Sequence, residues 1–274
     1  MKRIGLLLVT LFLAVMSFAQ TKSELYLREP VFQVGEKATY NIYFNLGFIW
    51  VHAGDVKFEC SSAMKNGKDC YKLSVTGYTM GMFEKYYVIR DTFVSYIDKN
   101  TLDPVAYEDH KHEDKYYSST RYVYTPTGDS VLVSYHRDKK NNSWDKQYNI
   151  ARNVYDLISC CYTTRNINTD ALVRKQQVPL VMMYDDSVHK LGLSFQGKKN
   201  LKVKNGTKYK TMYFTPSVIS GGLFKREEDL GVYVADDANH VPVYVEAKLK
   251  MGSAIASLGK IEGTKYPMTS IIKK

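Results

Sequence analysis

With 274 residues, the chain is long enough to bury a substantial core as one large domain or two small ones. Lysine and arginine number 38 against 28 aspartate and glutamate residues, which gives a formal net charge of +10. Segments of mixed sign carry this charge, so nothing beyond the net charge favours nucleic-acid binding, and we expect none. Tyrosine occurs 23 times and β-branched residues recur, a composition that favours strands over helices.

The first nineteen residues have the pattern of a secretory signal peptide. Lys2 and Arg3 precede an almost wholly apolar run over residues 4–16, and Ser17 and Ala19 supply small side chains at the −3 and −1 positions. The apolar run is shorter than the roughly 18–20 residues needed to cross a bilayer. We therefore expect cleavage after Ala19 and export of the mature chain to the periplasm or cell envelope, without a transmembrane segment.

Apolar and polar residues alternate along much of the remaining chain, the pattern of half-buried strands. Tyr40, Ile42 and Phe44 share one face of such a strand, and Gly with Asp or Asn separates this strand-like run from the next ones, as in hairpin turns. No fixed repeat and no proline- or serine-rich linker divides residues 20–274. We predict a single, mainly β domain there, a large antiparallel sheet curled into an open barrel or a sandwich, because so many strands must curl or stack to bury one face.

One short central helix is predicted over residues 153–165. The apolar residues at positions i, i+3, i+4 and i+7, which share one helical face, are Val154, Leu157, Ile158 and Cys161. Asn153 is suited to cap its start, Asp156 lies in the first turn and Arg165 near the end, where each charge suits the helix dipole.

The four cysteines divide into two pairs. Cys60 and Cys70 border two strand-like runs, and a disulfide between them is a candidate if those runs form a hairpin in the right register. Cys160 and Cys161 are neighbours on the predicted helix, where side chains diverge by about 100°, so they are not expected to bond each other. Packing of both as small apolar residues is the simpler interpretation, and pairing with Cys60 or Cys70 is the alternative.

Two polar segments suggest binding sites. On a strand, His110 and His112 share a face with Glu108 and Asp114, which makes the two histidines weak candidate metal ligands; the alternative is a charged, solvated strand face. The lysine-rich segment 197–210 fits either a solvated edge strand or an anion site.

Catalytic and cofactor motifs are absent from the sequence: it contains no G-x-S-x-G, H-E-x-x-H, Walker loop or G-x-G-x-x-G. We therefore predict no cofactor. The acidic pairs Asp185-Asp186 and Asp236-Asp237 stand in turn-like contexts and are expected to form turns. A glycosidase built on two carboxylates distant in sequence stays open.

The order of these elements resembles the family of exported bacterial proteins known as the domain of unknown function DUF3108, from about residue 32 to residue 263. Its opening has a phenylalanine before a Gly-Glu pair, an aromatic strand and an Ala-Gly pair; later come a proline after a turn, a central helix between Asp and Arg, and a closing hairpin. The matching residues are Phe32, Gly35, Glu36, Tyr40, Ala53, Gly54, Pro104, Asp156, Arg165, Asp236, Asp237, Pro242 and Gly252. The resemblance implies an envelope location and a β-rich fold, carries over no catalytic residue, and does not include the histidines.

Two functions follow as hypotheses. The first is a non-enzymatic envelope protein whose curved sheet binds a hydrophobic or lipid-like small molecule, or an envelope partner protein, and it predicts an open concavity lined by Tyr, Phe and Met. The second is a hydrolase acting on envelope glycans or other polymers, and it predicts convergent carboxylates or histidines with perturbed titration.

Overall fold

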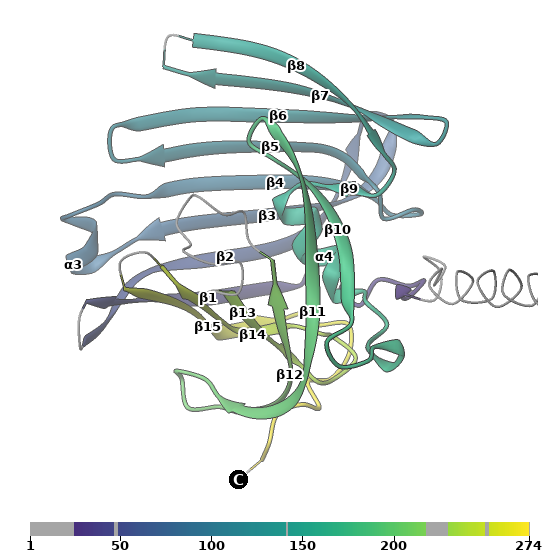
Figure 1. Cartoon of the computed structure of the whole chain (residues 1–274). Helices are drawn as coiled ribbons and strands as arrows, with labels where there is room; N and C mark the ends of the chain where they lie inside the picture. The colour runs from purple at the N-terminus through teal and green to yellow at the C-terminus, as the bar shows by residue number, and fades with distance from the viewer. Residues whose placement is uncertain (1–24, 47–48, 141, 218–229, 250–251, 274) are drawn as a thin grey trace, which may run out of the picture.

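The computed structural model of the chain describes residues 25–46, 49–140, 142–217, 230–249 and 252–273 (Figure 1). Fifteen strands form one sheet in the order β8-β7-β6-β5-β4-β3-β2-β1-β15-β14-β13-β12-β11-β10-β9. The pairings are antiparallel except that of β9 with β10. The sheet curls into a barrel-like shape that stays open between its edge strands, β8 and β9 (Figure 1). The prediction of a mainly β, antiparallel open barrel is confirmed. The signal-peptide prediction concerns residues 1–19, which lie outside the described residues.

The strands fall in chain order on either side of the β1–β15 pair. Their bounds are β1 (Lys37–Leu46), β2 (Ile49–Lys65), β3 (Lys68–Thr79), β4 (Arg90–Asp98), β5 (Pro104–Glu113), β6 (Tyr116–Thr127), β7 (Ser130–Lys139), β8 (Asn142–Ala151), β9 (Val154–Tyr155), β10 (Gln177–Tyr184), β11 (Ser187–Lys202), β12 (Lys208–Pro216), β13 (Leu230–Ala235), β14 (Pro242–Lys248) and β15 (Ser253–Glu262). Short turns join most neighbours: Asn66 and Gly67, both at positive φ, close the β2–β3 hairpin, as expected for an Asn-Gly type I′ turn.

Helical elements are few and short in the described part of the chain. They include α3 (Gly81–Glu84), α4 (Leu157–Arg165) and the 3-10 turn η2 (Thr169–Ala171). No helix in these ranges is long and apolar enough to span a bilayer. α4 and the long β10–β11 hairpin lie over the face of β3–β6, on the concave side of the sheet (Figure 1).

The central helix starts later than predicted. Val154 and Tyr155 form β9 instead of a first helical turn. Asp156 is therefore the N-cap: its carboxylate accepts hydrogen bonds from the backbone N–H groups of Ile158 and Ser159, and the Ser159 hydroxyl accepts one from the Asp156 N–H. This reciprocal arrangement is a capping box. The predicted cap at Asn153 is wrong because pairing with β10 holds the preceding residues extended.

The buried face of α4 also differs from the predicted one. The helix buries Ile158, Ser159, Tyr162 and Arg165. Cys160 packs beside the apolar group that contains Ile167, whereas Cys161 remains accessible to water. The packing role expected for both thiols therefore holds for Cys160 only.

The candidate disulfide between Cys60 and Cys70 does not form, and both thiols are free. Cys60 pairs with Leu73 and Cys70 pairs with Ala63, so the two cysteines are three residues out of register. An odd offset places their side chains on opposite faces of the sheet. Burial raises the pKa of the Cys60 thiol to about 12, so it behaves as an apolar core side chain.

Candidate functional site on the concave face of the sheet

A buried ion pair joins Glu36, just before β1, to Arg165 at the end of α4, and both belong to the pattern of the resemblance. Arg165 Nη1 and Nη2 lie 2.5 and 3.0 Å from the two carboxylate oxygens of Glu36. Arg165 Nε and Nη2 also donate to the backbone carbonyl of Asn239. Glu36 is only 2% exposed, so the bidentate geometry compensates two charges that have lost their water.

Aromatic residues surround this pair. The rings of Phe32 and Tyr162 face the guanidinium at 5.8 and 5.4 Å. The Tyr40 hydroxyl donates to the carbonyl of Pro242 at 2.9 Å. The cluster joins the start of β1, the end of α4 and the β13–β14 turn. Because its charged groups are paired with each other, we assign it a structural role.

The remaining pattern residues also support the scaffold. A Cβ added at Gly54, beside buried Ala53, would lie 2.1 Å from the carbonyl oxygen of Tyr78, and Gly35 and Gly252 have positive φ, where glycine is favoured. Pro104 opens β5 at an irregularity in its pairing with β4. No chemistry is indicated for these positions.

The acidic pair of the β13–β14 turn holds neighbouring segments in place. Asp237 accepts hydrogen bonds from the N–H groups of Asn239 and Ser270, and Asp236 pairs with Lys198 at 2.9 Å. Both acids also border an open pocket of 560 Å³ next to His240. Their predicted turn role agrees with these contacts.

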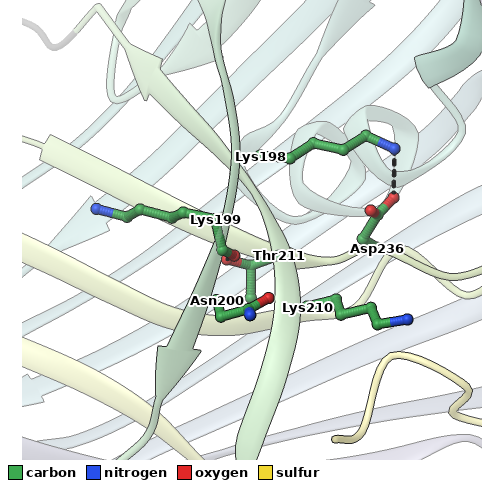
Figure 2. Close-up of a pocket in the computed structure, with 6 residues that line it drawn as sticks. All are labelled: Lys198, Lys199, Asn200, Lys210, Thr211 and Asp236. Atoms are coloured by element: carbon green, nitrogen blue, oxygen red, sulfur yellow. Dashed lines mark hydrogen bonds and ion pairs between the residues drawn. The ribbon is translucent and has the colours of Figure 1, made fainter.

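The lysine-rich segment lines a pocket of 260 Å³ on β11 and β12 (Figure 2). Lys198 is paired with Asp236, and the Lys199 ammonium lies over the rings of Tyr213 and Tyr233 at 4.8 and 4.6 Å. Figure 2 shows the side chain of Lys199 pointing to the opposite side from those of Lys198 and Lys210, and Lys198 is already paired with Asp236. The lysines therefore do not converge on one anion.

The two candidate metal ligands lie on the outer face of β5. His112 stacks on Tyr117 with the ring centroids 4.2 Å apart, and His110 is exposed. Within the ranges that the structure describes, no group of three or more His, Cys, Asp or Glu residues is placed to hold a metal ion.

An apolar stripe covers the concave face of β1, β2 and β13–β15. Directly paired residues of antiparallel strands present their side chains on the same face. Ile42 of β1 pairs with Ala256 of β15, which pairs with Val245 of β14, and Val245 pairs in turn with Val232 of β13. These side chains are only half-buried, unlike a close-packed core. The half-buried residues of this stripe are Ile42, Phe44, Val56, Val232, Val245, Ala247, Ala254 and Ala256. Phe44 contacts Phe83 of α3 at one end, with the ring centroids 5.7 Å apart.

A polar cluster continues the same face on β4–β7. Phe93 pairs with Val75 on one side and Asp109 on the other, and Asp109 pairs with Thr120. Among the described residues, the buried polar atoms of this cluster that form no hydrogen bond are Asp109 Oδ1, Ser118 Oγ, Thr120 Oγ1, Tyr135 Oη and Arg137 Nε.

Two carboxyl groups of the cluster have perturbed titration. Burial raises the pKa of Asp109, which Lys111 only partly offsets. Burial also raises the pKa of Asp91 to about 6, against a backbone hydrogen bond from His112. Perturbed groups in a sheltered site mark candidates for binding or catalysis.

The turn of the β10–β11 hairpin lies over this cluster. Arg137 Nη1 lies 3.1 Å from Asp185 Oδ1, and the Tyr122 hydroxyl donates to the Asp185 carbonyl at 2.9 Å. Lys146 pairs with Asp186 at 2.6 Å. The two acids do form the turn, as predicted, but the sequence carried no signal that the turn packs on cations from β7 and β8.

Cys161 of α4 lies near Tyr40 of β1. Burial raises the pKa of its thiol to about 11 although the side chain is accessible to water.

A crystal structure of similar fold is the "Beta-barrel-like Protein of Domain of Unknown Function DUF1849 from Brucella abortus". The match has a TM-score of 0.60 and 10% sequence identity, and it covers 86% of this chain and 100% of that one. At this identity the likeness shows the fold alone. No curated protein is a detectable sequence relative.

The sequence profile described as "Protein of unknown function (DUF3108)" matches residues 39–258, most of the chain. The family expected from the sequence is thereby confirmed. The chain belongs to the DUF3108 family.

Proposed function

We propose that the chain is an exported, non-catalytic envelope protein that binds a hydrophobic, lipid-like ligand on the concave face of its sheet. The observation that carries this proposal is the apolar stripe, whose side chains face the interior and yet are only half-buried. Leaving apolar surface in water costs about 25 cal/mol per Å², so a ligand that covers the stripe gains affinity. An acyl-like chain contributes about 0.8 kcal/mol for each buried CH₂ group.

Ligand sites in proteins are typically concave and mostly apolar, with a few polar groups that fix orientation. The apolar stripe and the adjoining polar cluster have this composition. The pattern of a basic start, an apolar run and small residues over positions 1–19 supports the exported location.

Filling the stripe tests this proposal. Ala256→Trp and Ala254→Trp each place a large ring among half-buried neighbours. We expect both to weaken binding of a neutral apolar fluorescent probe at least tenfold in titrations. Lys260→Trp is the control, because Lys260 is exposed on the same strand and pairs with Thr39 on the outer face. Equal affinity in all three folded variants would contradict the proposal.

The occupant is identified from protein purified from its native envelope. Native mass spectrometry is expected to release a lipid-sized mass that Ala256→Trp reduces. A co-purifying polypeptide in its place would support the partner-protein alternative.

A hydrolase acting on envelope glycans or other polymers is the second candidate. The observation in its favour is the raised pKa of both Asp91 and Asp109 on adjacent strands of the concave face. This candidate requires turnover of envelope glycans by the purified protein, and loss of turnover in Asp91→Asn and Asp109→Asn. Absence of turnover in the wild-type protein over the pH range 4–8 would remove it.

A further inference from the structure

Two cations on the concave face converge on one carboxylate oxygen. Arg137 Nη1 of β7 lies 3.1 Å from Asp185 Oδ1, and Lys111 Nζ of β5 lies 3.9 Å from the same atom. Both cationic side chains are largely buried, at 12% and 11% exposed, whereas Asp185 is 43% exposed. Two sheltered cations therefore share the partly solvated Asp185, and Asp109 is a further acid beside Lys111.

This arrangement leaves donor groups unused. The Lys111 ammonium is too far from Asp185 for a hydrogen bond. The Ser118 hydroxyl is buried without a partner among the described residues. Arg137 Nε and the Thr120 hydroxyl also form no regular hydrogen bond there, although Tyr135 and Asp109 lie beside them. Ser118 pairs directly with Lys111, and Thr120 pairs directly with Arg137. A buried donor without an acceptor costs about 1–3 kcal/mol, so the cluster would gain from a larger acceptor than one carboxylate.

We infer that Lys111 and Arg137 form a binding site for an anionic group, a carboxylate or a phosphate, and that Asp185 occupies this site as an internal substitute when no ligand is bound. The inference rests on the proposed function: the anionic group is the head of an amphipathic ligand whose tail lies along the apolar stripe. Phe93 links the two regions, since it pairs with Asp109 on the polar side and with Val75 on the apolar side.

Asp185 is placed so that it can leave the cations. It lies in the two-residue turn between Tyr184 and Ser187, at a positive φ of 50°. Its release would unpair no strand residue, because the β10–β11 ladder ends at Tyr184 and Ser187. Asp186, the other turn residue, pairs with Lys146 and stays bound to the sheet.

Neighbouring acids oppose an incoming anion only in part. Asp91 and Asp109 lie beside Lys111, and burial raises the pKa of both carboxyl groups. Their protonated forms would add donors instead of repulsion, so an anion whose own charge stays the same between pH 5.5 and pH 7.5 is expected to bind more tightly at pH 5.5.

The test compares three probes by isothermal titration calorimetry: dodecyl phosphate, neutral dodecanol and inorganic phosphate. Wild-type protein should bind dodecyl phosphate at least tenfold more tightly than dodecanol. Lys111→Met should abolish this preference, and Lys111→Arg should restore it. Asp185→Asn should tighten dodecyl phosphate binding by about threefold or more, because the internal competitor is removed. Asp186→Asn is the matched control and should change nothing.

The outcomes separate this inference from the proposed function. Equal affinity for dodecyl phosphate and dodecanol, or no gain in Asp185→Asn, would overturn the anion site while leaving the apolar stripe standing. Lys111-dependent binding of inorganic phosphate that a dodecyl chain does not strengthen would support the anion site and assign it to a free anion. Retained dodecanol binding in Lys111→Met shows that the variant is folded.

Discussion

At the scale of single residues, the Glu36–Arg165 pair is held by contacts on both sides. Both side chains are buried, and the guanidinium engages Glu36 and the Asn239 carbonyl at once. A buried pair of this kind contributes little relative to apolar substitutes, but breaking it leaves an uncompensated charge. Its value is therefore in joining three segments in one geometry.

Glu36→Ala should lower the free energy of unfolding by about 3–5 kcal/mol, because Arg165 is left buried without its counter-charge. The double variant Glu36→Leu, Arg165→Met should lose less than the single variant, since both charges are removed. Urea unfolding followed by circular dichroism measures both.

Lys37→Ala serves as the control for this pair. Lys37, the residue after Glu36, forms an exposed ion pair with Glu59. Loss of this ion pair should change the free energy of unfolding by no more than about 0.5 kcal/mol. A double variant less stable than Glu36→Ala would contradict the interpretation.

At the scale of elements, α4 depends strongly on its N-cap residue, Asp156. Asp156 caps the helix and also accepts the Ser95 hydroxyl at 2.9 Å, which joins the helix to β4. A nine-residue helix is too short to be stable alone, so packing and capping decide whether it forms.

We expect Asp156→Ala to destabilise the protein by about 2 kcal/mol or more. The substitution removes the cap, so the Ser95 hydroxyl and the Ser159 N–H group lose the carboxylate that accepts their hydrogen bonds. Asp156→Asn keeps an acceptor oxygen and should cost less. Thr163→Ala is the matched control on the same helix, because the Thr163 hydroxyl is buried without a partner among the described residues. Chemical denaturation measures the free energy of unfolding of the three variants. An equal decrease of this free energy in all three would refute the capping role.

At the scale of the whole molecule, the β1–β15 pair joins the first and the last strand of the chain in the middle of the sheet. Strands β1–β8 and β15–β9 extend from it in opposite directions, so the edge strands β8 and β9 are consecutive in the chain. This order makes one curled sheet from two runs of hairpins, and its concave face collects residues from both runs.

Export is the prediction that concerns the whole chain. Expression in a Gram-negative host should yield a periplasmic product that begins at Gln20, as read by intact-mass analysis and N-terminal sequencing. Ala19→Arg should block processing, because the −1 position needs a small residue. Phe18→Leu, at the neighbouring position, should be processed normally, and a cytoplasmic, unprocessed wild-type product would disprove export.

The sequence by itself determined the strands, many of their turns and the family. Alternation placed Tyr40, Ile42 and Phe44 on one face, and Asn66-Gly67 marked a hairpin, because strand period and turn chemistry are local properties of the chain. The ordered landmarks from Phe32 to Gly252 identified the family without indicating what they do.

Only the tertiary structure decided register and what covers each face. A three-residue offset separates Cys60 from Cys70, and strand pairing at β9 moves the helix start to Asp156. Asp185 meets Arg137 across 48 positions of sequence. Such pairings depend on how a whole sheet curls, because the energy of a cross-strand contact depends on neighbours that no local pattern specifies.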